Sequence, residues 1–137
     1  MKRLEIYIDG AAKGNPGPAG IGVVICQDGE VVKNIAEYIG NTTNNVAEYT
    51  ALIYALEEAL IMKAESLKIN TDSQLLHRQI KGIYKVKHPN IIGLHERVKH
   101  LLSGFKEVVI HNIPREKNCG ADKLATEAVK KRARVGL

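Results

Sequence analysis

Apolar and polar positions alternate at the start of the chain. Every second residue from Leu4 to Ile8 is apolar, and Asp9 follows. This two-residue period is typical of a strand with one buried face. A second apolar run, GIGVVIC, continues through QDGE into VVKNIAEYI. The Asp28-Gly29 pair between these runs predicts a tight hairpin, because its turn requires positive φ angles. We therefore expect three strands here, the last two being antiparallel neighbours.

The period changes in the segment TTNNVAEYTALIYALEEALIM, residues 42–62. Apolar residues now recur at intervals of three and four, which predicts a helix with one buried stripe. The stripe consists of Val46, Tyr49, Ile53, Leu56 and Leu60. Thr43, Asn44 and Asn45 offer side-chain oxygens for the N-cap. Asn45 and Glu48 have the three-residue separation of a capping box, so we expect Glu48 in the first turn of this helix.

The rest of the chain alternates between the two periods. SLKINTD predicts a short strand, and SQLLHRQI a brief helix closed by Gly82. GIYKVKHPN is expected to be a loop ending at Pro89, followed by a helix over IIGLHERVKHLL. KEVVIHNI predicts the last strand and ADKLATEAVKKRA the last helix. This order is typical of an α/β fold with antiparallel and parallel parts.

Composition adds limits on the class of protein. The chain has 137 residues, 45% of them hydrophobic, which fits one globular domain over residues 1–137 with a largely aliphatic core. The formal net charge of +5 favours polyanionic partners without establishing one. Cys26 and Cys119 lack C-x-x-C spacing, which argues against a zinc site or a disulfide and suits a reducing cytosol. Glutamates within residues 46–62 exclude a membrane span there. We expect a cytoplasmic monomer without membrane contact or an obligate protein partner.

Four acidic residues occupy corresponding places in this pattern. Asp9 is expected to close the first strand and Asp72 the strand LKINT, whereas Glu48 and Asp122 begin helices. In an α/β sheet these positions gather at one edge, where ligands bind. Clustered carboxylates require cations among them, and ligands that are all oxygen favour Mg²⁺ or Mn²⁺. Two such ions can hydrolyse a phosphodiester. Each acid alone would usually be a cap or turn residue.

Four motifs resemble type 1 ribonuclease H, in the same order and across nearly the whole chain. They are YIDGAAKGNPGPAGIG, TTNNVAEYTAL, NTDSQ and NCGADKLA. The resemblance implies a ribonuclease H-like five-stranded mixed sheet, three antiparallel strands and then two parallel ones, flanked by helices. It also implies metal-dependent hydrolysis of the RNA strand of RNA–DNA hybrids, with two Mg²⁺ ions per site and Mn²⁺ as a possible substitute.

The resemblance assigns roles to individual residues. Asp9, Glu48, Asp72 and Asp122 match the catalytic, metal-binding acids of the family. The positions that match substrate-binding residues are Gly10, Asn15, Thr43, Asn44, Asn45 and Gln74. Amide side chains both donate and accept hydrogen bonds, which suits base edges and 2′-hydroxyls without reading sequence. Their alternative role is turn formation and capping.

The chain also departs from the family pattern. The loop NIPREKNCGAD lacks the common histidine, and we assign its catalytic role to Arg115, as in a subset of the family. His111 lies on the preceding strand and is expected to be a strand residue. Only KGIYKVKHPN replaces the long basic protrusion, and Asn41 stands where the family has a phosphate-binding arginine. The basic end KKRARVGL could contact phosphate or only complement the helix dipole.

Two other functions are compatible with the same residues. The chain could be a non-catalytic nucleic-acid-binding module, although four acids speak against a loss of chemistry. It could also be a nuclease of this fold that prefers double-stranded RNA, because A-form minor grooves present similar edges to amide side chains.

Overall fold

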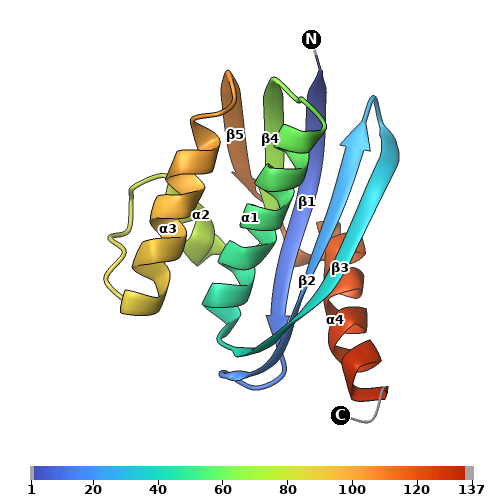
Figure 1. Cartoon of the computed structure of the whole chain (residues 1–137), viewed down its shortest axis with the longest axis vertical. Coiled ribbons are helices and arrows are strands. Elements are labelled where there is room, and N and C mark those ends of the chain that lie inside the picture. Colours follow the sequence, from blue (N-terminus) through green and yellow to red (C-terminus); the bar gives the residue numbers. More distant parts are fainter. Residues whose placement is uncertain (1, 135–137) are drawn as a thin grey trace.

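A mixed β-sheet forms the centre of the molecule (Figure 1). The computed structural model describes residues 2–134, with side chains through residue 131. The five strands lie in the order β3-β2-β1-β4-β5. Their bounds are β1 Arg3–Ala12, β2 Gly17–Gln27, β3 Glu30–Thr42, β4 Ser66–Thr71 and β5 Glu107–Asn112. The pairs β1–β2 and β2–β3 are antiparallel, and β1–β4 and β4–β5 are parallel. The expected five-stranded mixed sheet is confirmed.

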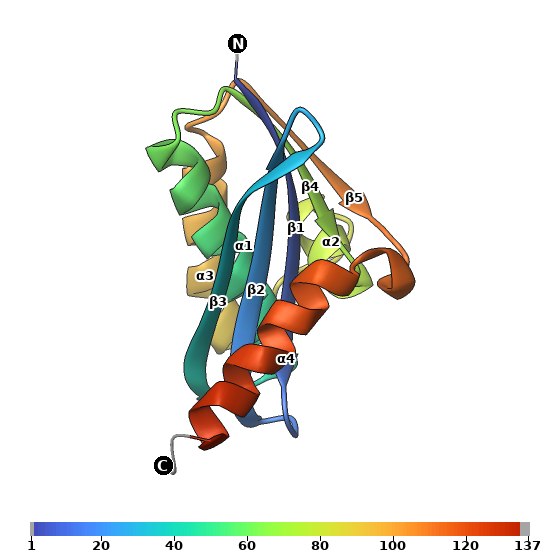
Figure 2. The ribbon, with the colours of Figure 1, turned by 90° about the vertical axis from the view of Figure 1, so that its right-hand side faces the viewer.

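Helices cover both faces of the sheet (Figure 2). Their bounds are α1 Asn44–Ile61, α2 Gln74–Ile80, α3 Pro89–Leu102 and α4 Cys119–Arg134, with a 3₁₀ turn, η1, at Arg115–Lys117. Helices α1 and α3 lie on one face, and α4 crosses the other over β2 and β3. The core is aliphatic apart from Tyr49, and Phe105 is only partly buried. None of the helices in the described range is long and apolar enough to cross a membrane.

Local turn chemistry places several element ends where the sequence predicts them. Asp28 and Gly29 have φ angles of 53° and 81°, as a primed hairpin turn requires. Gly82, with a φ of 77°, follows α2 directly after its cap. Helix α3 begins at Pro89 rather than after it, because proline at the first helical position lacks only an N–H that would be unpaired there.

The expectation that Asp9 closes the first strand is wrong. Strand β1 pairs with β2 as far as Ala12, and Asp9 lies opposite Gly22 within that ladder. The parallel pairing with β4, however, ends at Ile8 and Thr71. Asp9 is therefore the first residue of β1 beyond the end of β4, which brings it beside Asp72 at the carboxyl end of β4.

The expected capping box at the start of α1 is also wrong. Thr43 is the N-cap, and its Oγ1 accepts a hydrogen bond of 3.2 Å from Val46 N. Glu48 consequently lies beyond the first turn, and its Oε1 accepts a hydrogen bond of 3.1 Å from Gly10 N instead of reaching Asn45 N. The hydrogen-bond donor to Glu48 is thus the backbone N–H of Gly10 on β1, which is distant in sequence, and not the N–H of nearby Asn45.

Two glycines allow α1, which carries Glu48, and α4, which carries Asp122, to lie close to the strands. A Cβ added to Gly10 would lie 2.3 Å from the carbonyl carbon of Ala47 in α1. A Cβ added to Gly22 would lie 2.1 Å from the carbonyl oxygen of Ala121 in α4. Neither contact can be relieved by moving a flexible side chain, because both meet backbone. These approaches bring Glu48 and Asp122 toward the sheet beside Asp9.

Gly22→Ala is expected to lower the free energy of unfolding by about 1–3 kcal/mol or more, because overpacking must displace α4. Gly93 provides the matched control: it lies in α3, and a Cβ there meets nothing within 4 Å. Gly93→Ala should raise the free energy of unfolding by up to about 1 kcal/mol through helix propensity. Urea denaturation measures both. Equal stability of Gly22→Ala and the wild type would contradict the close packing of α4.

Candidate active site

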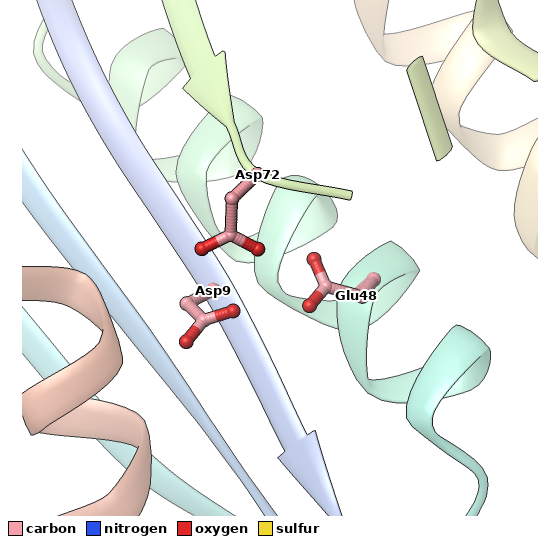
Figure 3. Close-up of side chains that lie close together, drawn as sticks. All are labelled: Asp9, Glu48 and Asp72. Atoms are coloured by element: carbon pink, nitrogen blue, oxygen red, sulfur yellow. The ribbon is translucent and has the colours of Figure 1, made fainter. Parts of the chain in front are cut away.

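Three carboxylates converge at the edge of the sheet where β4 ends (Figure 3). Asp9, Glu48 and Asp72 each offer an oxygen, and these atoms all lie within 4.8 Å of one another. The residues come from β1, from α1 and from the position after β4. Figure 3 shows their carboxyl groups turned toward a common space. Residues far apart in the chain thus form one acidic cluster.

Burial gives this cluster unusual electrostatics. Asp9 is only 6% exposed and Glu48 7%. Burial raises the pKa of Asp9, and the nearby carboxylates of Glu48 and Asp72 raise it further. Burial also raises the pKa of Glu48, while hydrogen bonds from Asp9 and from Gly10 N oppose the rise. Asp9 and Glu48 therefore keep a proton at a higher pH than free carboxyl groups do.

The donor atoms of the cluster fit a bound cation. Oε2 of Glu48 is buried and has no hydrogen-bond partner in the described part of the protein. Among residues 2–131, none of the ion pairs involves Asp9, Glu48 or Asp72. Oxygen atoms at this spacing are the ligands that hard divalent cations prefer. A metal ion would relieve both the unpaired oxygen and the mutual repulsion.

Asp122 is the fourth acid, on the wall of the same cavity. It lies in the first turn of α4, where the helix dipole favours a carboxylate. The cavity has a volume of about 640 Å³. Asp122 lines it together with the three clustered acids but is not part of their 4.8 Å group. The structure therefore brings all four predicted acids to one cavity, with three of them in closest contact.

The side-chain oxygens of the predicted asparagines differ in whether they accept a hydrogen bond. Asn44 Oδ1 accepts a hydrogen bond of 2.9 Å from Ala12 N, and Asn15 Oδ1 one of 3.0 Å from Asn44 N. These oxygens tie the loop between β1 and β2 to the start of α1. Asn45 Oδ1 is buried without a hydrogen-bond partner among the described residues. All three residues line the cavity, although the amide oxygens of Asn15 and Asn44 already serve in turn formation and that of Asn45 is buried.

The other three predicted substrate-binding residues differ in whether they line the cavity. Gly10 lines the cavity, but its N–H is bound to Glu48 and its Cα lies against the backbone of α1. Thr43 caps α1, and Gln74 is exposed at the start of α2. Neither Thr43 nor Gln74 lines the cavity, whereas Ser73 and Leu75 do. Sequence reasoning did not single out these two neighbours of Asp72.

Arg115 and His111 take clearly different positions. Arg115 lies in η1 and lines the cavity, with Nη2 4.0 Å from Asp122 Oδ1 and a side chain that is 81% exposed. His111 lies within β5, as expected. It is exposed and lines a separate cavity of about 440 Å³ together with Arg3 and Glu5. Of the two candidates, only Arg115 borders the acids.

The remaining basic segments lie away from the acids. Residues 81–88 form a loop between α2 and α3 that is exposed except at Val86, and the Arg78 guanidinium lies over the Tyr84 ring, 5.1 Å from its centroid. At the C-terminus, Lys130 and Lys131 are exposed on α4. The other residues of KKRARVGL lie outside the part of the chain whose side chains the structure describes.

Sequence reasoning also passed over Asn118, although it stands first in the motif NCGADKLA. It is 1% exposed and donates a hydrogen bond of 3.1 Å to Asp72 Oδ2. An asparagine before a helix is usually interpreted as a cap. The only signal in the sequence was its presence in the motif that contains Asp122.

Comparison with known proteins identifies relatives of the chain and of its fold. A family model described as reverse transcriptase-like matches residues 7–128. The chain is 41% identical over 128 residues to ribonuclease HI of Halobacterium salinarum, covering 93% of this chain and 64% of that protein. The crystal structure of RNase H1 from Halobacterium salinarum superimposes with a TM-score of 0.92 at 41% identity, covering 94% and 98% of the two chains.

A second solved structure contains nucleic acid. LC11-RNase H1 in complex with an RNA/DNA hybrid is 44% identical, with a TM-score of 0.89 and coverage of 95% of this chain and 99% of that one. Some curated relatives are longer proteins: the chain spans 64% of the Halobacterium relative and 35% of the mycobacterial ones.

Proposed function

The chain belongs to the type 1 ribonuclease H family, and we propose that it hydrolyses the RNA strand of RNA–DNA hybrids by a two-metal-ion mechanism. The observation that carries the proposal is the convergence of Asp9, Glu48 and Asp72 within 4.8 Å, in a cavity also lined by asparagines. The similar LC11-RNase H1 binds an RNA/DNA hybrid, which supports the same substrate class here.

The four acids are the proposed metal ligands, with Mg²⁺ as the resident ion and Mn²⁺ as its substitute. The unpaired Glu48 Oε2 and the raised pKa of Asp9 and Glu48 support a site completed by cations. Bound ions would supply Lewis-acid stabilisation of the phosphate and a water of lowered pKa. Asp9, Glu48, Asp72 and Asp122 would hold them from the edge of the sheet.

The other cavity residues would bind and orient the hybrid. Asn15, Asn44 and Asn45 line the cavity, and amide groups of this kind suit 2′-hydroxyls and base edges. Gly10 also lines this cavity, and its lack of a side chain lets α1, which carries Glu48, lie close to β1. Thr43 and Gln74 stay proposals for contacts outside the cavity. Arg115, charged at any working pH, would orient a phosphate or stabilise developing charge.

The wider setting of the activity is also proposed. Residues 1–137 would act as a single catalytic domain and a monomer, without an obligate protein partner or a membrane surface. Both cysteines are free, which is compatible with the reducing cytoplasm that we propose as the location.

A substrate panel tests the proposal. End-labelled RNA–DNA hybrid, double-stranded RNA and DNA duplex of one sequence would be incubated with the protein and Mg²⁺ or Mn²⁺. We expect internal cuts in the RNA strand of the hybrid, abolished by a chelator. Preferential cleavage of double-stranded RNA would assign a different substrate, and binding without cleavage under either metal would indicate a non-catalytic module.

Arg115→Ala is expected to lower the cleavage rate about a hundredfold or more, with little change in the Mg²⁺ dependence, because Arg115 borders Asp122 without joining the acidic cluster. Arginine cannot act as a general base, so the pH–rate profile should have no limb near pH 6.5 that depends on this loop. His111→Ala, the control, should retain wild-type turnover. A limb abolished by His111→Ala would instead make the strand histidine part of the reaction.

A further inference from the structure

Asn118 occupies an unusual place between the acids. It follows η1 and immediately precedes α4, and its residue exposure is only 1%. Its Nδ2 donates one hydrogen bond of 2.8 Å to Ile8 O and another of 3.1 Å to Asp72 Oδ2. Both hydrogens of the amide are therefore used, one on the backbone of β1 and one on a carboxylate of the cluster.

The chemistry of the neighbours fixes which way the amide faces. Ile8 O and an ionised Asp72 carboxylate can only accept hydrogen bonds, so the NH₂ group must point toward them. The amide oxygen then points away, and Oδ1 is buried without a hydrogen-bond partner among the described residues. A side chain used only for capping α4 would direct its oxygen to the N–H groups of the helix. Here the oxygen is left unpaired so that the donors can reach Asp72 and Ile8.

Asn118 links three of the four acids. It holds Asp72 directly, and Ile8, its second acceptor, is the residue before Asp9. Its own carbonyl oxygen accepts a hydrogen bond of 3.1 Å from Asp122 N. One buried residue thus connects the end of β4, the middle of β1 and the start of α4.

We propose that Asn118 is a positioning residue, which orients the Asp72 carboxylate by engaging Oδ2 and so prepares Asp72 for metal binding. The inference rests on the proposed function, since it assumes that the acids bind metal. A donor that orients a ligating carboxylate usually affects metal affinity strongly, and its loss typically costs about 10- to 100-fold in affinity or activity.

Asn118→Ala is the variant that tests this role, and Asn112→Ala is its matched control. Asn112 is exposed at the end of β5, and its Nδ2 donates 3.2 Å to Thr71 O, the backbone next to Asp72 rather than its carboxylate. Each substitution removes an asparagine side chain that donates a hydrogen bond at the carboxyl end of β4, to Thr71 or to Asp72. Only Asn118→Ala removes the donor to the ligand atom.

Two measurements are compared between the variants. Calorimetric titration of Mn²⁺ into the protein alone should give an affinity lowered about 10-fold or more in Asn118→Ala and unchanged in Asn112→Ala. In hybrid cleavage, the Mg²⁺ concentration for half-maximal rate should rise by a similar factor in Asn118→Ala, with the KM for hybrid unchanged. Equal metal affinity in Asn118→Ala, Asn112→Ala and the wild type would overturn the proposal.

The wild type provides a measurement that does not depend on the variant folding. In nuclear magnetic resonance spectra, the side-chain amide protons of Asn118 should exchange slowly with solvent, and their resonances should shift in Asp72→Asn more than those of Asn112. Rapid exchange, or no shift, would also overturn the assignment. A wild type that binds Mn²⁺ but cleaves no hybrid would contradict the proposed function alone, and calorimetry would still decide the role of Asn118.

Discussion

Asp72→Asn is expected to lower the rate of hybrid cleavage by at least about a thousandfold. The substitution keeps the size of the side chain but removes the charge that would hold metal ions, and metal stabilisation of a phosphoryl transition state is worth several kcal/mol. The fold should survive, because Asp72 is only partly buried and lies at the end of β4. Initial rates on end-labelled hybrid at saturating Mg²⁺ measure the effect.

Asp28→Asn is the matched control for this loss of one negative charge. Asp28 lies in the hairpin turn with a φ of 53°, a conformation that asparagine also tolerates. Its turnover should equal that of the wild type. Near-wild-type turnover in Asp72→Asn would show that Asp72 does not bind a metal ion needed for the reaction.

The second large effect is a loss of stability as pH rises when metal is absent. The folded state raises the pKa of Asp9 and Glu48, chiefly through burial. A carboxyl whose folded pKa exceeds its unfolded value contributes stability that is complete below the unfolded value, about pH 4. That contribution is lost as pH rises through the folded pKa. In chelator, the free energy of unfolding should therefore fall from weakly acid pH through the neutral range.

Asp9→Asn isolates the contribution of the cluster. Without metal, it should be more stable than the wild type at pH 8, because the folded wild type must either keep a proton on Asp9 or bury its charge beside Glu48 and Asp72, and asparagine avoids both costs. Mg²⁺ should reverse the order: at 100 times its Kd it adds about 2.7 kcal/mol to a protein that binds it only when folded. Thermal melts of both proteins in chelator and in Mg²⁺ measure this. An unchanged melting temperature of the wild type in saturating Mg²⁺ would contradict a metal site at the acids.

Much of the secondary structure followed from local pattern. The two-residue period of β1, the three- and four-residue period of α1 and the Asp28-Gly29 turn each depend on neighbouring residues, so sequence alone indicates them. The order of elements and the expected mixed sheet are confirmed. The four acids were also predicted to meet at one sheet edge, because strand and helix ends fix which side of an α/β sheet they occupy.

Errors arose where the partner of a residue is distant in sequence. The pattern placed Asp9 at the end of its strand, but β1 continues because β2 pairs with it through Ala12. Asn45 and Glu48 have the spacing of a capping box, yet Gly10 N is the donor that Glu48 accepts from. Spacing in the sequence indicates which nearby residue could be the hydrogen-bond partner. Only the packing of the fold decides whether a residue distant in sequence takes that place.

By itself, the sequence determined the strands and helices and their α/β order, because periodicity and turn chemistry depend on neighbouring residues. The five-stranded arrangement was implied by the family resemblance, and the four acids stood out by their positions at strand and helix ends. The tertiary structure decided which oxygens lie together, since the register of β1 with β4 sets Asp9 beside Asp72. It also decided that Gly10 and Gly22 admit α1 and α4 at close range, and that Asn118 reaches both Ile8 and Asp72. These contacts join residues tens of positions apart, and no local pattern specifies the distance between them.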